Sequence, residues 1–90
     1  GQVLDPRRQR LIFYDGFHNT VWTLPLEGAG TWRQLSLPGA LPAPRRYPTL
    51  VLDESRDRLI LYGGIGYGGN LRAEVWVLPL QEPTAWSRMS

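Results

Sequence analysis

The side chains best suited to chemistry are few in this chain, and they do not form a recognisable catalytic set. His18 is the single histidine, and cysteine is absent from the 90 residues. A metal site normally needs several converging ligands, and a catalytic histidine needs a nucleophile or substrate beside it. We therefore expect no catalytic residue, no metal, no cofactor and no enzymatic activity.

Two further segments resemble known sites only in part. Residues 53–57 (DESRD) hold three carboxylates, but they lack the spacing and the glycine of a calcium-binding loop. Residues 63–69 (GGIGYGG) are rich in glycine, but neither the Lys-Ser/Thr pair nor the helix of a phosphate-binding loop follows them. We interpret the first segment as a hairpin turn and the second as a surface loop.

The charge pattern also argues against nucleic acid as a partner. All ten basic residues are arginine, and they are interleaved with eight acids to give a net charge of +2. Arginine forks can bind phosphate, but scattered arginines more often end strands and form ion pairs. No apolar run approaches the roughly 18 residues of a membrane helix, so we expect no membrane partner. The absence of cysteine leaves the compartment open.

A repeat organises the chain. Residues 10–16 (RLIFYDG) recur as 58–64 (RLILYGG), an offset of 48. After a loop that is six residues longer in the second copy, residues 21–26 (VWTLPL) recur as 75–80 (VWVLPL), an offset of 54. Repetition at a period of about 50 residues is typical of propellers and related repeat folds.

Each copy contains four short apolar segments joined by turns. The eight prolines and ten glycines interrupt any helical pattern, so we expect an all-β fold. The segments are apolar in nearly continuous runs, which indicates antiparallel sheets covered on both faces, as in a propeller blade. At the first hairpin of each copy we expect an ion pair, Asp5 with Arg10 and Asp53 with Arg58, to act as a structural clamp.

The motif D-x-x-x-x-R-L-I-x-Y-G-G, followed by V-W-x-L and a final tryptophan strand, resembles the kelch repeat. The resemblance is to the bacterial kelch and galactose-oxidase-central-domain type, over nearly the whole chain. The residues that carry it, in this order and spacing, are Arg46, Asp53, residues 58–64, Val75, Trp76 and Trp86. It implies two four-stranded antiparallel blades: residues 1–36 with a short innermost strand, a linker at 37–46, and residues 47–90. It also implies packing between blades for Trp22, Trp32, Trp76 and Trp86.

Two blades cannot close a propeller, which needs about four to eight. The uncovered faces would then be apolar, and head-to-tail contacts between copies could cover them. We expect a homo-oligomer with an even number of blades, six as a homotrimer or, second, eight as a homotetramer. Such a ring would act as a structural or protein-interaction scaffold. The alternative is a fragment of a longer kelch propeller.

The kelch resemblance also implies that loops on one face of the propeller bind a peptide or protein. The residues expected on that face are Phe17, His18, Asn19, Arg45, Arg46, Tyr67, Asn70 and Arg72. A less favoured alternative is a carbohydrate, small-ligand or anion site at the channel mouth, formed by Arg45 and Arg46.

Overall fold

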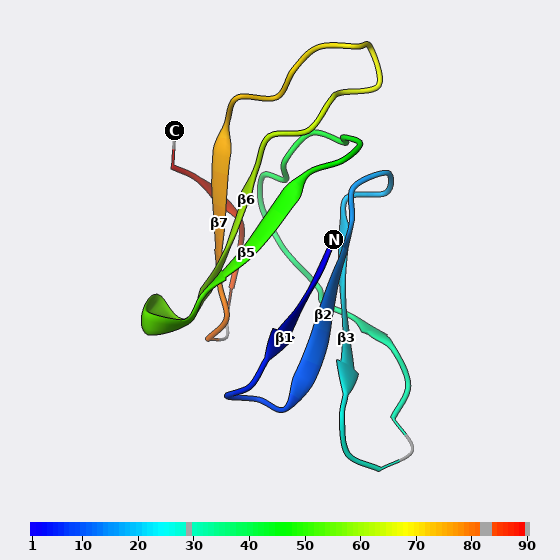
Figure 1. Ribbon diagram of the computed structural model, residues 1–90, viewed down its shortest axis with the longest axis vertical. Coiled ribbons are helices and arrows are strands. Elements are labelled where there is room, and N and C mark those ends of the chain that lie inside the picture. The colour runs from blue at the N-terminus through cyan, green and yellow to red at the C-terminus, as the bar shows by residue number, and fades with distance from the viewer. Residues whose placement is uncertain (29, 82–83, 90) are drawn as a thin grey trace.

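The computed structural model describes residues 1–28, 30–81 and 84–89, and these form two four-stranded antiparallel sheets (Figure 1). The strands of the first sheet are β1 (Gln2–Asp5), β2 (Arg10–Asp15), β3 (Thr20–Pro25) and β4 (Arg33–Gln34). Those of the second are β5 (Thr49–Asp53), β6 (Arg58–Tyr62), β7 (Val75–Pro79) and β8 (Ser87–Arg88). The only helix in the described ranges is the 3-10 turn η1 (Glu54–Arg56). The predicted all-β fold with two such sheets is confirmed.

The two sheets share one register as well as one sequence pattern. Val3 pairs with Ile12 in the first sheet, and their repeat counterparts Val51 and Ile60 pair in the second. Likewise Phe13 pairs with Trp22, and Leu61 pairs with Trp76. Here a repeat counterpart is the residue 48 positions away in the first two strands of a sheet and 54 away in the last two. Because residues paired across strands lie on the same face, counterparts occupy equivalent faces of their sheets.

The first hairpin of each sheet contains the expected ion pair. Arg10 Nε donates to Asp5 Oδ2 at 3.0 Å, and Arg58 Nε donates to Asp53 Oδ2 at 2.9 Å. Each pair joins residues that lie directly opposite each other, at the point where the two strands meet the turn. The ion pair therefore links the strand ends across the turn. Both predicted hairpin clamps are confirmed.

The hydrophobic core lies between the two sheets. The first sheet contributes Ile12, Tyr14 and Val21, and the second contributes Leu59, Leu61, Trp76, Leu78, Leu80 and Trp86. The ring of Trp86 meets the ring of Tyr14 edge-on, with centroids 5.9 Å apart. We call the two sheet surfaces that enclose this core the inner faces, and the opposite surfaces the first and second outer faces.

The segment between the sheets is fastened to both of them. The backbone N–H of Arg45 donates to the Gly16 carbonyl at 3.0 Å, and its guanidinium NH1 donates to the Gly63 carbonyl at 3.2 Å. A Cβ at Gly16 would collide with the carbonyl oxygen of Arg45, so this close approach requires glycine. In the described part of the chain, no helix is long and apolar enough to span a membrane.

Candidate protein-interaction site

The two outer faces carry apolar side chains, many of them exposed. Those of the first outer face are Leu4, Leu11, Phe13, Trp22, Leu24 and, beside β4, Trp32. Those of the second are Val51, Ile60, Tyr62, Val75 and the buried Val77. Among these side chains, Tyr62 is 43% exposed and Trp32 is 45% exposed. Large aromatic side chains that are this exposed and lie next to other apolar side chains form an apolar surface patch. Contiguous exposed apolar surfaces are typical of association or binding sites.

Each outer face is the repeat counterpart of an inner face. On the first outer face, Phe13 and Trp22 correspond to Leu61 and Trp76, which the inner face of the second sheet buries. On the second outer face, Ile60, Tyr62 and Val75 correspond to the inner residues of the first sheet: Ile12, Tyr14 and Val21. The two outer faces therefore have the residue pattern of two surfaces that already pack together inside this chain.

The first outer face is hollowed where a neighbouring sheet would pack. The hollow is lined by Gln2, Phe13, Trp22 and Trp32. The rings of Phe13 and Trp32 meet edge-on at 6.4 Å, and Trp22 Nε1 donates to Thr20 Oγ1 at 3.0 Å. The hollow is thus lined mainly by aromatic rings, two of which contact each other.

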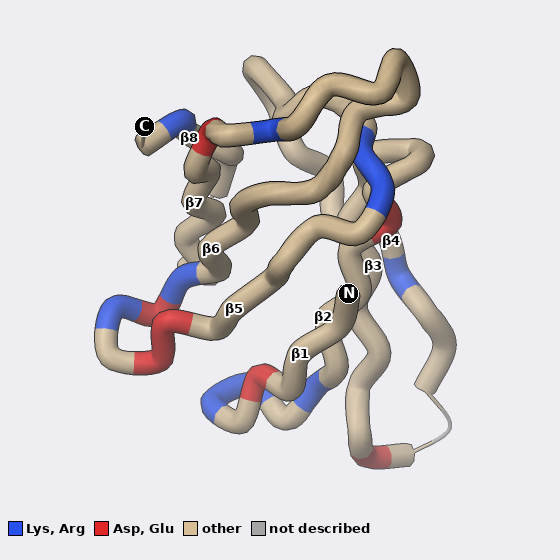
Figure 2. Tube along the Cα trace, turned by 45° about the horizontal axis from the view of Figure 1, so that its top comes forward, with Lys and Arg blue, Asp and Glu red and all other residues tan. Residues whose placement is uncertain are grey.

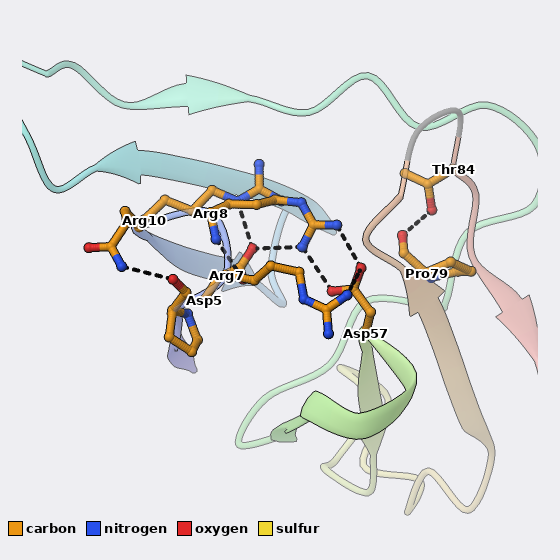
Figure 3. A network of polar contacts seen from close by, with 9 residues as sticks. Asp5, Arg7, Arg8, Arg10, Asp57, Pro79 and Thr84 are labelled. Atoms are coloured by element: carbon orange, nitrogen blue, oxygen red, sulfur yellow. Dashed lines mark hydrogen bonds and ion pairs between the residues drawn. The ribbon is translucent and has the colours of Figure 1, made fainter.

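A polar clamp joins the sheets at the end opposite the long loops (Figures 2 and 3). Arg8 binds Asp57 through two parallel bonds, NH1 to Oδ1 at 2.8 Å and NH2 to Oδ2 at 2.7 Å. The same guanidinium reaches Asp5 at 3.3 Å, and Arg7 approaches Asp57 at 3.4 Å. The hydrogen bonds from Arg8 hold the pKa of Asp57 below its usual value and raise the pKa of the guanidinium itself.

The first hairpin of the second sheet repeats half of this clamp. Arg56 NH1 donates to Asp53 Oδ2 at 3.4 Å, and its side chain is 68% exposed. The hydrogen bond from Arg58 lowers the pKa of Asp53, and Arg56 adds a smaller electrostatic contribution. Arg56 is the repeat counterpart of Arg8, and exposed Gln9 is the counterpart of Asp57. The position that holds a carboxylate at the internal contact therefore holds an amide on the outer surface.

At the long-loop end, four side chains from three loops form an exposed stack. The ring of Phe17 lies 4.8 Å from that of His18 and 5.3 Å from that of Tyr67, and the Arg46 guanidinium lies 5.2 Å from the Tyr67 centroid. His18 Nδ1 contacts Asp15 Oδ2 at 2.7 Å, and this bond lowers the pKa of Asp15. We call Phe17, His18, Arg46 and Tyr67 the loop stack.

The structure thus brings together four of the eight residues expected on the loop face. Asn70 is exposed nearby in the same loop as Tyr67, and the guanidinium of half-buried Arg72 lies under Gly66. Two expected positions are wrong, because Asn19 is 8% exposed and Arg45 is 1% exposed. The Asn19 amide accepts from the Tyr14 hydroxyl and donates to the Pro42 carbonyl, and Arg45 binds backbone carbonyls. Asn19 therefore ties the first sheet to the segment between the sheets, and Arg45 ties that segment to both sheets.

The four tryptophans divide into two pairs. Trp76 and Trp86 are buried between the sheets, at 9% and 4% exposure. Trp22 and Trp32 lie on the first outer face, away from the second sheet, so their expected packing between blades stays a prediction that concerns a neighbour outside this chain. Sequence reasoning did not separate the two pairs. Register, which alternates the faces of each strand, was the signal that could have done so.

No group of three or more His, Cys, Asp or Glu residues is placed to hold a metal ion within residues 1–28, 30–81 and 84–89. The three aspartates at the first hairpins of the two sheets each bind an arginine: Asp5 with Arg10, Asp53 with Arg58, and Asp57 with Arg8.

Comparison with known proteins points in the same direction as the fold. No family model matches the chain. An F-box/kelch-repeat protein of Arabidopsis thaliana is 37% identical over 65 residues, a match that covers 69% of this chain. The chain spans only 13% of the length of that relative. The similarity favours kelch-type repeats, in agreement with the motif resemblance.

Proposed function

We propose that this chain is a non-enzymatic, kelch-type propeller unit that assembles head-to-tail with copies of itself into a closed, even-bladed ring. The first outer face of one copy covers the second outer face of the next. The observation that carries the proposal is the repeat equivalence between these faces and the two faces already packed inside the chain.

Energetics favour covering both faces together. Burial of apolar surface contributes about 25 cal/mol per Å² removed from water, so two faces built from aromatic and branched side chains offer a substantial driving force. A head-to-tail contact leaves one face free at each end until the ring closes, and closure removes both ends at once. Three copies would give six blades and four copies eight, both within the range of known propellers.

Further blades of a longer propeller are the competing occupant of the outer faces. Such blades would use the same face-to-face contact, so the contact itself is common to both hypotheses. The two hypotheses differ in whether copies of this chain alone cover its outer faces.

Cross-linking tests the head-to-tail arrangement directly. The chain has no cysteine, so Gln9→Cys and Arg56→Cys each introduce a single thiol. When the two variants are mixed with a short bifunctional maleimide, we expect cross-links that join position 9 of one chain to position 56 of another. Each variant alone should give almost none. Efficient cross-linking of either variant with itself would contradict the head-to-tail contact, because it would place identical surfaces together.

A second candidate function is binding of a peptide or protein at the loop stack. Phe17 is 59% exposed and Tyr67 is 46% exposed, although large aromatic rings at loop tips are costly to leave in water. Arg and Tyr are residue types that protein interfaces favour. The alternative of an anion site formed by Arg45 and Arg46 loses support, because Arg45 is buried and Arg46 is the one member of that pair at the surface.

The loop stack is tested by selecting a displayed peptide library against the wild-type chain. Selected peptides should bind the Phe17→Ala and Tyr67→Ala variants at least tenfold more weakly. The control Tyr47→Ala removes an even more exposed ring, at 81%, that takes no part in the stack, and it should not change binding. Equal binding to all variants would remove the loop stack as a site.

A further inference from the structure

We infer that Gln9 limits the strength of the contact between copies, because Arg56 of one copy lies against Gln9 of the next where Arg8 meets Asp57 inside the chain. This inference rests on the proposed head-to-tail assembly. It names the polar partner of Arg56 and explains why the internal and external contacts differ.

The hairpin turns that hold Gln9 and Asp57 share the same pattern of backbone hydrogen bonds, although only the second contains a 3-10 turn. Both residues have positive φ, 51° and 52°. The N–H of Gln9 donates to the Pro6 carbonyl at 3.4 Å, and that of Asp57 donates to the Glu54 carbonyl at 3.2 Å. Their own carbonyls accept from the N–H groups of Leu26 and Leu80, at 2.9 and 3.0 Å. Gln9 therefore presents its side chain from the position that Asp57 uses.

The arginines opposite them are also equivalent. Arg8 donates to Asp5 at 3.3 Å, and Arg56 donates to Asp53 at 3.4 Å, so each is oriented by the carboxylate at the end of its hairpin strand. Arg8 is then covered by Asp57 and is 25% exposed, whereas the Arg56 side chain remains 68% exposed. Arg56 is the half of the clamp that has no second sheet beside it in this chain.

Gln9 is a poorer acceptor than Asp57. A carboxylate accepts two parallel bonds from a guanidinium and adds charge attraction, whereas an amide offers one neutral oxygen. Gln9 Nε2 also donates to the Pro6 carbonyl at 2.9 Å, which fixes its amide on its own turn. The contact between copies therefore lacks the bidentate ion pair visible in Figure 3.

The test is Gln9→Asp, which gives the outer surface the residue that the internal contact already has. Asp also tolerates positive φ better than Gln, so the turn should be preserved. We expect the dissociation constant between copies to fall roughly three- to tenfold at low ionic strength, the range of a well-aligned ion pair. The gain should shrink as salt is added.

Two matched variants isolate the charge. Gln9→Asn has the shape and turn preference of Asp without its charge, and it should leave the dissociation constant near that of the wild type. Gln9→Asp combined with Arg56→Gln should lose the gain. Circular dichroism should show the same sheet content for every variant.

The outcomes separate this inference from the proposed function. If the wild type assembles but Gln9→Asp binds no tighter than Gln9→Asn, the Arg56–Gln9 contact is wrong and the head-to-tail assembly stands. If the wild type and Gln9→Asp both remain monomeric at every concentration, the proposed assembly is wrong and this inference falls with it.

Discussion

The two sheets share a sequence pattern and a register, yet they bury opposite faces. Trp86 is 4% exposed and its counterpart Trp32 is 45% exposed, whereas Tyr14 is 1% exposed and its counterpart Tyr62 is 43% exposed. The neighbouring sheet decides which face of each blade is buried, because the side chains of both faces are apolar. The exposed half of each pair shows where a further sheet would pack.

The comparison also holds for polar residues. Buried Thr23 on the inner face of the first sheet corresponds to Val77 on the second outer face. Val77 is 8% exposed, so both positions are buried within this chain, and the second outer face carries the more apolar residue of the two.

The largest contrast should come from Trp32 and Trp86, which directly precede the final strands of their sheets. Trp86→Ala should lower the free energy of unfolding by about 3–5 kcal/mol, because it removes a buried ring from the core. Trp32→Ala should leave unfolding of the isolated chain nearly unchanged but weaken association between copies. Urea unfolding and sedimentation of both variants check this, and equal losses of folding stability would contradict the distinction between faces.

A charge on the second outer face should separate assembly from folding. Tyr62→Lys is expected to weaken association at least a hundredfold, since it would bury an unpaired ammonium between copies. The folded chain should keep its circular dichroism spectrum, because residue 62 is exposed within it. If Tyr62→Lys associates like the wild type, that face does not form the contact.

The hydroxyls of Tyr14 and Tyr62 give a smaller contrast. The Tyr14 hydroxyl donates to Asn19 Oδ1 at 2.7 Å in a buried site, and burial raises the pKa of this tyrosine to about 12. Tyr14→Phe should cost about 1 kcal/mol of folding stability, as expected for loss of one buried hydrogen bond. Tyr62→Phe should cost close to nothing in urea unfolding of the monomer. A larger loss for Tyr62→Phe would overturn the comparison.

The smallest expected effect concerns pH. Hydrogen bonds from Arg8 lower the pKa of Asp57 in the folded chain, so its contribution to stability is present above the unfolded value of about 3.9. This contribution is lost as pH falls through the lower folded pKa. Asp57→Asn should therefore be less stable than the wild type at pH 7, and the gap should narrow on acidification below about pH 4. Urea midpoints measured at both pH values would contradict this if the gap stayed constant.

Much of the fold could be predicted because the repeat sets strand positions and turn residues locally. Asp5–Arg10 and Asp53–Arg58 were predictable from spacing within one hairpin. The burial of Arg45 was not, because it depends on Gly16 and Gly63, which belong to different sheets. The inner face of each sheet was likewise not predictable, because the strands carry apolar residues on both faces.

The loop stack shows the same limit. Phe17, His18, Arg46 and Tyr67 were each predicted as loop residues, but their convergence depends on how three loops meet at one end. Asn19, which follows His18 directly in sequence, turns inward to Tyr14 instead. The exposure of a loop side chain is hard to predict from sequence, because adjacent loop residues can point in different directions.

The mass of this chain in solution, measured by light scattering across a wide concentration range, tests the central claim most directly. A single mass of three copies, with no larger species, at all concentrations well above the dissociation constant is the predicted result, and four copies would also satisfy a closed, even-bladed ring. A monomer at every concentration, or a mass that grows steadily with concentration, would contradict the ring and favour a fragment of a longer propeller.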